Sequence, residues 1–124
     1  MKKVVTMCVL AAVAMTFLIA AKKLPGKVNA PDPLAEQGKA VYAKSDCGTC
    51  HGAGGRGDGA TAAGYPADHK PANFASGKWK FGGDDKAVQE TISKGRPPYM
   101  PAHPQFKPDE LAALSAYVRS LVKK

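Results

Sequence analysis

Apolar side chains recur at helical spacing in three segments of the chain, at residues 33–45, 85–94 and 108–121. In the first segment the apolar face consists of Leu34, Gly38, Val41 and Tyr42. In the second it consists of Val88 and Ile92, and in the third of Leu111, Leu114, Val118 and Leu121. No β-strand pattern flanks the stretch that follows the first segment. The pattern therefore predicts an all-α fold with three main helices.

Capping residues predict where these helices begin and end. Asp32 is the expected N-cap of the first helix with Pro33 at its first position, and Asp84 caps the second. Gly95 stands where a helix commonly ends in a left-handed residue. Pro108 opens the last helix, whose N-cap position holds Lys107, a weak capping residue.

A separate apolar run precedes the helical segments. Residues 4–21 carry no charge and follow Lys2 and Lys3. This run exceeds the usual apolar region of a signal peptide and falls just short of a transmembrane helix. Residues 1–21 are therefore expected to be either a cleaved signal peptide or a retained membrane anchor, and both alternatives place the rest of the chain in the periplasm. Residues 22–32 read as an extended linker because they contain Pro25 and Pro31. One domain, residues 33–124, follows.

Two of the three cysteines and one of the three histidines lie in one pentapeptide, Cys47-Gly48-Thr49-Cys50-His51. In an exported chain a C-x-x-C-H run indicates covalent attachment of haem c. Each thiol adds across one vinyl group, and two intervening residues let one backbone turn bring both sulfurs to the porphyrin edge. His51 then lies under the iron as the proximal ligand.

Three other sites compete for the same residues. A thioredoxin-like site expects a βαβ setting, and a zinc site needs further ligands at suitable spacing. His69 and His103 are distant and lack that spacing. A plain disulfide between Cys47 and Cys50 would leave His51 without a role. Haem attachment is the interpretation that uses all three residues, and it predicts one covalent haem c.

The formal charge of +8 comes largely from the N-terminal segment. Five of the 18 basic residues precede residue 31 and no acidic residue does, so the rest of the chain has a net charge of +3. Clusters of Lys and Arg with interleaved aromatic residues are absent from the sequence. The charge is therefore no argument for a nucleic-acid partner.

Residues 52–64 contain six glycines in thirteen positions. No strand precedes this stretch and no Gly-Lys-Ser/Thr follows, so it is not a phosphate-binding loop. A flexible loop near the haem edge is expected. Further along, Trp79 is expected either to pack in the core or to donate its indole N–H to a haem propionate. For Arg56 two alternatives stand, contact with a haem propionate or a solvated side chain, and the solvated side chain is expected.

A second candidate iron ligand lies in residues 96–105, where four of ten residues are proline. These prolines forbid helix and strand and predict a stiff loop. At its centre is Met100, because Met1, Met7 and Met15 all belong to the N-terminal segment. A thioether is a soft ligand that suits the haem iron of cytochromes c and raises the reduction potential. His103 is the rival distal ligand in the same loop.

Taken together, the CGTCH site, the helix before it, the Gly-rich loop after it, the PPYMP loop and the terminal helix resemble a class I bacterial cytochrome c over residues 33–123. The resemblance implies helices and long loops wrapped round one covalent haem. It implies a crossing of the first and last helices through Gly38, Tyr42, Leu114 and Tyr117. It also implies that the carbonyl of a proline, Pro71 or Pro66, accepts a hydrogen bond from the proximal imidazole.

The expected function is that of a single-electron carrier, not an enzyme, working between exported or membrane-bound redox partner proteins. The sequence offers no second cofactor motif and no acid–base pair beside the expected haem. The alternative is a cytochrome c subunit of a larger dehydrogenase, oxidase or sulfur-oxidising complex. A third class, a ligand sensor or peroxidase, requires Met100 to be off the iron. Membrane contact is expected only if residues 4–21 are retained as an anchor.

Overall fold

The computed structural model describes residues 30–124, so the expected leader and most of the linker lie outside the described residues. Four α-helices occur in this part: α1 (Pro33–Lys44), α2 (Cys47–His51), α3 (Asp85–Lys94) and α4 (Pro108–Ser120). Short 3-10 turns lie at Ala62–Gly64, Ala67–His69 and Phe74–Ser76. Between residues 30 and 124 there is no strand, and the predicted all-α fold is confirmed. No helix within that range is long and apolar enough to cross a membrane.

The helix boundaries follow from the predicted caps. The Asp32 carboxylate accepts a hydrogen bond from the Leu34 amide at 3.0 Å, and Asp84 accepts one from the Ala87 amide at 3.0 Å. At the start of α4 the cap comes from within the helix, because the Glu110 carboxylate accepts from the Lys107 amide at 3.0 Å. This contact offsets the missing side-chain cap at Lys107, since it pairs a backbone donor at the helix start.

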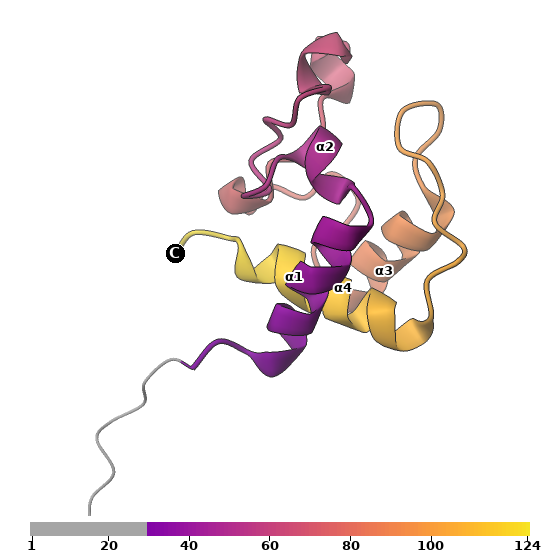
Figure 1. The fold of residues 1–124 in the computed structure, drawn as a ribbon. Coiled ribbons are helices and arrows are strands. Elements are labelled where there is room, and N and C mark those ends of the chain that lie inside the picture. The colour runs from indigo at the N-terminus through magenta and orange to yellow at the C-terminus, as the bar shows by residue number, and fades with distance from the viewer. Residues whose placement is uncertain (1–29) are drawn as a thin grey trace, which may run out of the picture.

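Helices α1 and α4 cross in close contact, as Figure 1 shows. Gly38 lies at the crossing, where a Cβ atom would come within 1.9 Å of the Ala113 carbonyl oxygen. Tyr42 and Tyr117 meet edge to face beside it, with ring centroids 5.2 Å apart. The two backbones can approach this closely only because residue 38 has no side chain. The expected crossing is therefore present.

The core is centred on this crossing and on the inner face of α3. Its buried cluster consists of Tyr42, Val88, Leu114, Tyr117 and Val118. The sequence pattern was wrong about one position, because Leu34 is 39% exposed. The buried residues of α1 are Ala35, Gly38 and Tyr42. Residue 35 takes the inner position because it lies one turn from Gly38, and only small side chains fit beside so close a crossing.

The glycine-rich segment after α2 is folded back onto that helix, contrary to the expected flexible loop. The amides of Gly57, Gly59 and Thr61 donate to the carbonyls of residues 51, 50 and 49 at 2.7, 3.2 and 3.1 Å. Gly57 has a φ of +74°, and a Cβ there would lie 2.6 Å from the Pro71 carbonyl oxygen. Glycine is needed because the chain turns tightly here and passes close to another backbone segment.

Candidate functional site

The C-x-x-C-H residues form a helix of their own, α2, directly after α1. Asp46 separates the two helices and adopts a left-handed conformation with φ of +55°. Tyr42 joins them, because its buried hydroxyl donates to the Gly52 carbonyl at 2.8 Å. Burial raises the pKa of Tyr42 and so keeps this hydroxyl protonated. Helix α1 therefore holds α2 at both ends.

The His51 imidazole is fixed from two sides. Its Nδ1 lies 3.2 Å from the Ala72 carbonyl oxygen, and its ring stacks on Phe74 with centroids 4.7 Å apart. Burial lowers the pKa of His51, which favours the neutral ring. In the neutral tautomer that donates from Nδ1 to this carbonyl, Nε2 keeps its lone pair, as a metal ligand requires.

The acceptor for His51 is neither Pro71 nor Pro66, so that part of the expectation was wrong. The Pro71 carbonyl instead faces Gly57, where the glycine-rich segment passes. The glycine-rich segment thus occupies the Pro71 carbonyl and leaves the Ala72 carbonyl for the imidazole. Every residue type carries a carbonyl, so no residue identity in the sequence could have singled out Ala72.

The two cysteines are free and half-buried, one helical turn apart on α2. The Cys47 Sγ lies 3.9 Å from the Ser45 carbonyl, and burial raises the pKa of its thiol. The Cys50 Sγ lies 3.4 Å from the Tyr65 hydroxyl and 3.3 Å from the Thr61 Oγ1. Neither Tyr65 nor Thr61 was singled out by the sequence, because their contacts depend on how the glycine-rich segment folds back.

Met100 lies in the loop between α3 and α4. The neighbouring Tyr99 ring packs against His69 at 4.5 Å and against Tyr65 at 5.8 Å between centroids. Since the Tyr65 hydroxyl also contacts Cys50, a continuous set of contacts runs from the Met100 loop to the C-x-x-C-H helix. The structure thus brings together two regions that are about 50 residues apart in the sequence.

His103, the rival distal residue, has contacts of its own. Its ring stacks on Phe106 with centroids 5.5 Å apart, and its Nδ1 lies 3.3 Å from the Gln105 amide nitrogen. Its backbone amide donates to the carbonyls at the end of α3, from Ile92 at 3.1 Å and from Ser93 at 3.2 Å. His103 therefore helps to connect the end of α3 to the segment before α4.

These residues fit a haem attached through two thioethers. Cys47 and Cys50 are unbonded thiols on adjacent turns, and the imidazole that follows them is held with one nitrogen available. Within residues 30–124 no group of three or more His, Cys, Asp or Glu could hold a metal ion. Two thiols and one imidazole within five consecutive residues match the donor set of a haem c attachment site.

Comparison with known proteins gives consistent results. Residues 35–122 match the family model for cytochrome c. The chain is 33% identical over 101 residues to the cbb3-type cytochrome c oxidase subunit FixP of Azorhizobium caulinodans, covering 81% of this chain and 31% of that protein. It is 35% identical over 88 residues to the cbb3-type subunit CcoP of Azospirillum brasilense, covering 70% of this chain and 28% of that protein.

A solved structure is also similar. A chain of the reducing HAO-like protein complex of Kuenenia stuttgartiensis aligns with a TM-score of 0.66 and 34% identity, covering 79% of this chain and 48% of that one. The present chain thus spans about a third of the length of the curated relatives and about half of the solved chain. The family match covers most of the sequence, and it coincides with the described residues that include the C-x-x-C-H helix. The chain belongs to the cytochrome c family.

Proposed function

We propose that this protein is a single-electron carrier with one haem c, attached through Cys47 and Cys50 and ligated by His51 and Met100. The observation that carries the proposal is the geometry of α2, where two free thiols and a fixed imidazole share one short helix. When bound, the haem supplies the iron that takes up and releases one electron. The protein's part is to hold the ligands, exclude water and leave a haem edge accessible to partners.

His51 is the proposed proximal ligand. The hydrogen bond between its Nδ1 and the Ala72 carbonyl orients the ring and increases the basicity of the other nitrogen. Stacking on Phe74 restricts rotation of the ring. A ligand whose orientation is already set needs little rearrangement between the two oxidation states.

Met100 is the proposed distal ligand. Its amide and carbonyl are both bonded to Arg96, at 3.0 and 2.8 Å, which closes a tight loop over residues 97–99 and fixes the backbone of Met100 at its end. Prolines on both sides, Pro98 and Pro101, stiffen the same loop. The loop can therefore hold the weak thioether ligand in place, whereas His103 is engaged with Phe106 and Gln105.

The proposed partners are redox proteins in the periplasm. We propose export because residues 1–21 have the pattern of a signal peptide or a membrane anchor. These residues lie outside the described part of the chain. Intact-mass analysis of the protein from native membranes tests the leader: a mature start at or beyond residue 21 means that residues 4–21 do not act as an anchor. A mass that includes these residues supports the anchored form.

A second candidate is a cytochrome c subunit of a larger redox complex. It is favoured by the relatives, whose names describe subunits of cbb3-type oxidases and part of an HAO-like complex. Stable co-purification with a fixed enzyme partner from native membranes would support the subunit. A protein that elutes alone and exchanges electrons with several partners would support the free carrier.

The haem attachment is tested by extraction of the purified protein with acid and acetone. We expect the haem to remain on the polypeptide, because two thioether bonds hold it. Cys47→Ser should weaken or abolish formation of the holoprotein. Release of all the haem into the organic phase would contradict the attachment through Cys47 and Cys50.

The distal ligand is tested with Met100→Ala. The parent should show the Met–ferric charge-transfer band and bind carbon monoxide poorly, because its sixth position is taken. The variant should lose this band, bind carbon monoxide readily in the ferrous state and have a lower midpoint potential. A parent that binds carbon monoxide rapidly and lacks the band would favour a sensor or peroxidase over a carrier.

A further inference from the structure

Arg96 opens the loop that carries Met100, directly after Gly95 at the end of α3. The Arg96 amide donates to the Met100 carbonyl at 2.8 Å and the Met100 amide donates back at 3.0 Å, which makes an isolated antiparallel bridge. Residues paired in this way project their side chains to the same side of the pair. The Arg96 side chain therefore leaves the loop on the same side as that of Met100.

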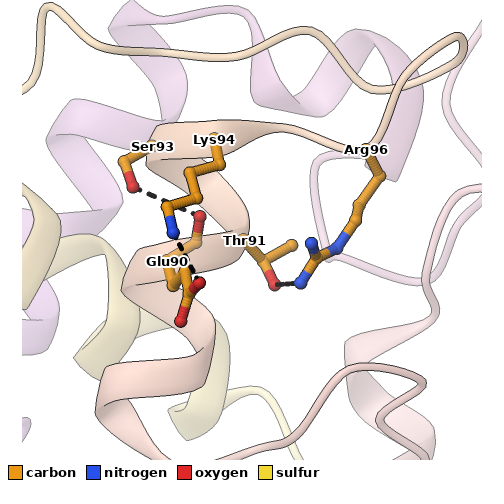
Figure 2. Close-up of polar contacts among 5 residues, drawn as sticks. All are labelled: Glu90, Thr91, Ser93, Lys94 and Arg96. Atoms are coloured by element: carbon orange, nitrogen blue, oxygen red, sulfur yellow. Dashed lines mark hydrogen bonds and ion pairs between the residues drawn. The ribbon is translucent and has the colours of Figure 1, made fainter.

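The guanidinium is held by neutral groups. Its Nη2 donates to the Thr91 Oγ1 at 3.0 Å, as Figure 2 shows, and its Cζ lies 4.2 Å from the centroid of the Phe81 ring. Its Nε is buried and has no hydrogen-bond partner among the described residues. A buried N–H of a charged group without an acceptor is unfavourable, because it has lost water and gained nothing in return.

No carboxylate of residues 30–124 forms an ion pair with Arg96. Glu90, on the neighbouring part of α3 in Figure 2, pairs with Lys94 at 2.8 Å. The other ion pairs of the described chain join Asp68 to His69 and Asp85 to Arg119. A planar guanidinium matches a carboxylate well, so its present contacts leave its main binding capacity unused.

The guanidinium also packs on an aromatic segment that leads towards the proposed proximal ligand. From His51 a set of stacked rings runs to Phe74 and on to Trp79, with centroids 4.7 and 5.7 Å apart. Phe81, which packs on Arg96, follows Trp79 by two residues. Arg96 contacts this aromatic segment and α3, while its backbone is bonded to Met100; none of its hydrogen bonds involves α2.

We propose that Arg96 binds a propionate carboxylate of the haem, an inference that rests on the proposed haem attachment. The vinyl groups of haem lie on one half of the porphyrin and the propionates on the other. A porphyrin attached to α2 through its vinyl carbons therefore directs its carboxylates away from Cys47 and Cys50. Arg96 forms no hydrogen bond with α2, and it supplies a positive charge and a free buried N–H for one of these carboxylates.

The test is to follow the ionisation of the propionates directly. The holoprotein is prepared with haem labelled by carbon-13 at the propionate carboxyls, and its infrared spectrum is recorded against pH. The isotope separates these bands from those of Glu90 and other side-chain carboxylates. In Arg96→Gln we expect the midpoint of one propionate to rise by about 1–3 pH units, since a nearby opposite charge lowers a carboxyl pKa by that amount. The reduction potential at pH 7 should fall.

The matched control is Lys86→Gln, which removes one positive charge from an exposed position on α3. Its propionate midpoints should equal those of the parent. Arg96→Lys keeps the charge but loses the planar fork, and it should give an intermediate shift. If Arg96→Gln does not form holoprotein, the propionate midpoints of Arg96→Lys and the parent are compared instead, and a raised midpoint in Arg96→Lys supports the role of Arg96.

Two failures can be told apart. Labelled propionates that titrate identically in the parent and both Arg96 variants would overturn the role of Arg96 while the haem attachment stands. A parent without thioether-bound haem would overturn the proposed function and this inference together.

Discussion

At the scale of single residues, the fold depends most clearly on Gly38. A Cβ atom at this position would lie 1.9 Å from the Ala113 carbonyl oxygen and 2.8 Å from the Tyr117 Cβ. The clashing atoms belong to the backbone and to the first atom of a side chain, so no rotamer change can relieve them. Close contact between α1 and α4 is possible only with glycine at position 38.

Gly38→Ala should therefore destabilise the holoprotein by about 3 kcal/mol, the upper part of the range for overpacking, because α1 and α4 must separate. Denaturant unfolding followed by far-UV circular dichroism measures this change. Gly64→Ala is the matched control, since an added Cβ there meets nothing within 4 Å. An equal loss of unfolding free energy in the two variants would contradict the close contact of α1 and α4 at Gly38.

A second prediction concerns Asp85, which accepts a hydrogen bond from the buried Ser115 hydroxyl at 2.8 Å and pairs with Arg119. The hydrogen bond from Arg119, followed by that from Ser115, lowers the pKa of Asp85. A lowered pKa in the folded state stabilises the protein above the unfolded pKa of about 3.9. This contribution is lost as the pH falls through the folded value.

Asp85→Asn should cost roughly 0.5–1 kcal/mol at pH 7, because the pair is partly exposed and screened by solvent. The difference from the parent should shrink as the pH falls through the folded pKa of Asp85, because the parent carboxyl is then also neutral. Asp109→Asn, in the first turn of α4, is the control for loss of a charge near a helix N-terminus. A loss at Asp85 that persists unchanged at low pH would show that the ionised pair is not its cause.

At the scale of elements, the glycine-rich segment, residues 52–64, packs along α2 through backbone hydrogen bonds. Between residues 55 and 61 its amides alternate between those with and those without a hydrogen bond. Gly57, Gly59 and Thr61 donate to carbonyls of α2, whereas the amides of Arg56 and Ala60 form no hydrogen bond with the described residues. The segment also receives the Phe74 amide on the Gly55 carbonyl at 2.7 Å. It connects the C-x-x-C-H helix to the residues that position His51.

Hydrogen exchange in the native holoprotein tests this arrangement. We expect the amides of Gly57, Gly59 and Thr61 to exchange at least about tenfold more slowly than those of Arg56 and Ala60, after correction for intrinsic rates. A tenfold difference corresponds to roughly 1.4 kcal/mol of opening free energy. Uniformly fast exchange across residues 52–64 would restore the flexible loop that glycine content suggested.

At the scale of the whole molecule, a positive rim is expected around the proposed haem edge. It consists of Lys39, Lys44, Lys78, Lys80, Lys94 and Arg96. The five lysines are exposed, and three of the six side chains have partners, since Lys80 bonds the Asp68 carbonyl, Lys94 pairs with Glu90 and Arg96 bonds Thr91. Charges of this kind guide association with an acidic partner and are screened by salt.

Electron transfer to an acidic redox partner should therefore slow several-fold as ionic strength rises from 0.01 to 0.5 M, because the screening length shrinks from about 30 Å to a few ångströms. Stopped-flow spectroscopy gives the second-order rate constant. Lys78→Gln should reduce the rate at low salt, whereas Lys123→Gln, outside the rim, should not. A rate that does not depend on salt would remove any steering by the rim.

The sequence was sufficient where the chemistry is local. Asp32, Asp84 and Gly95 predict the helix ends because capping depends on residues within one turn. The C-x-x-C-H spacing predicts a haem site for the same reason, since both thiols and the imidazole lie within five residues. The ligation by His51 and Met100 and the division of residues 1–32 stay predictions.

Contacts between distant segments were decided by the tertiary structure alone. The sequence pattern put Leu34 on the inner face, but the close approach at Gly38 turns Ala35 inward instead. Six glycines suggested flexibility, yet backbone hydrogen bonds to α2 order the segment. The partner of His51 is Ala72 and not a proline, because a carbonyl is selected by position rather than by residue type. Composition and spacing thus determined the family, the helices and the haem-attachment motif, while packing decided which backbone groups and charges surround that motif.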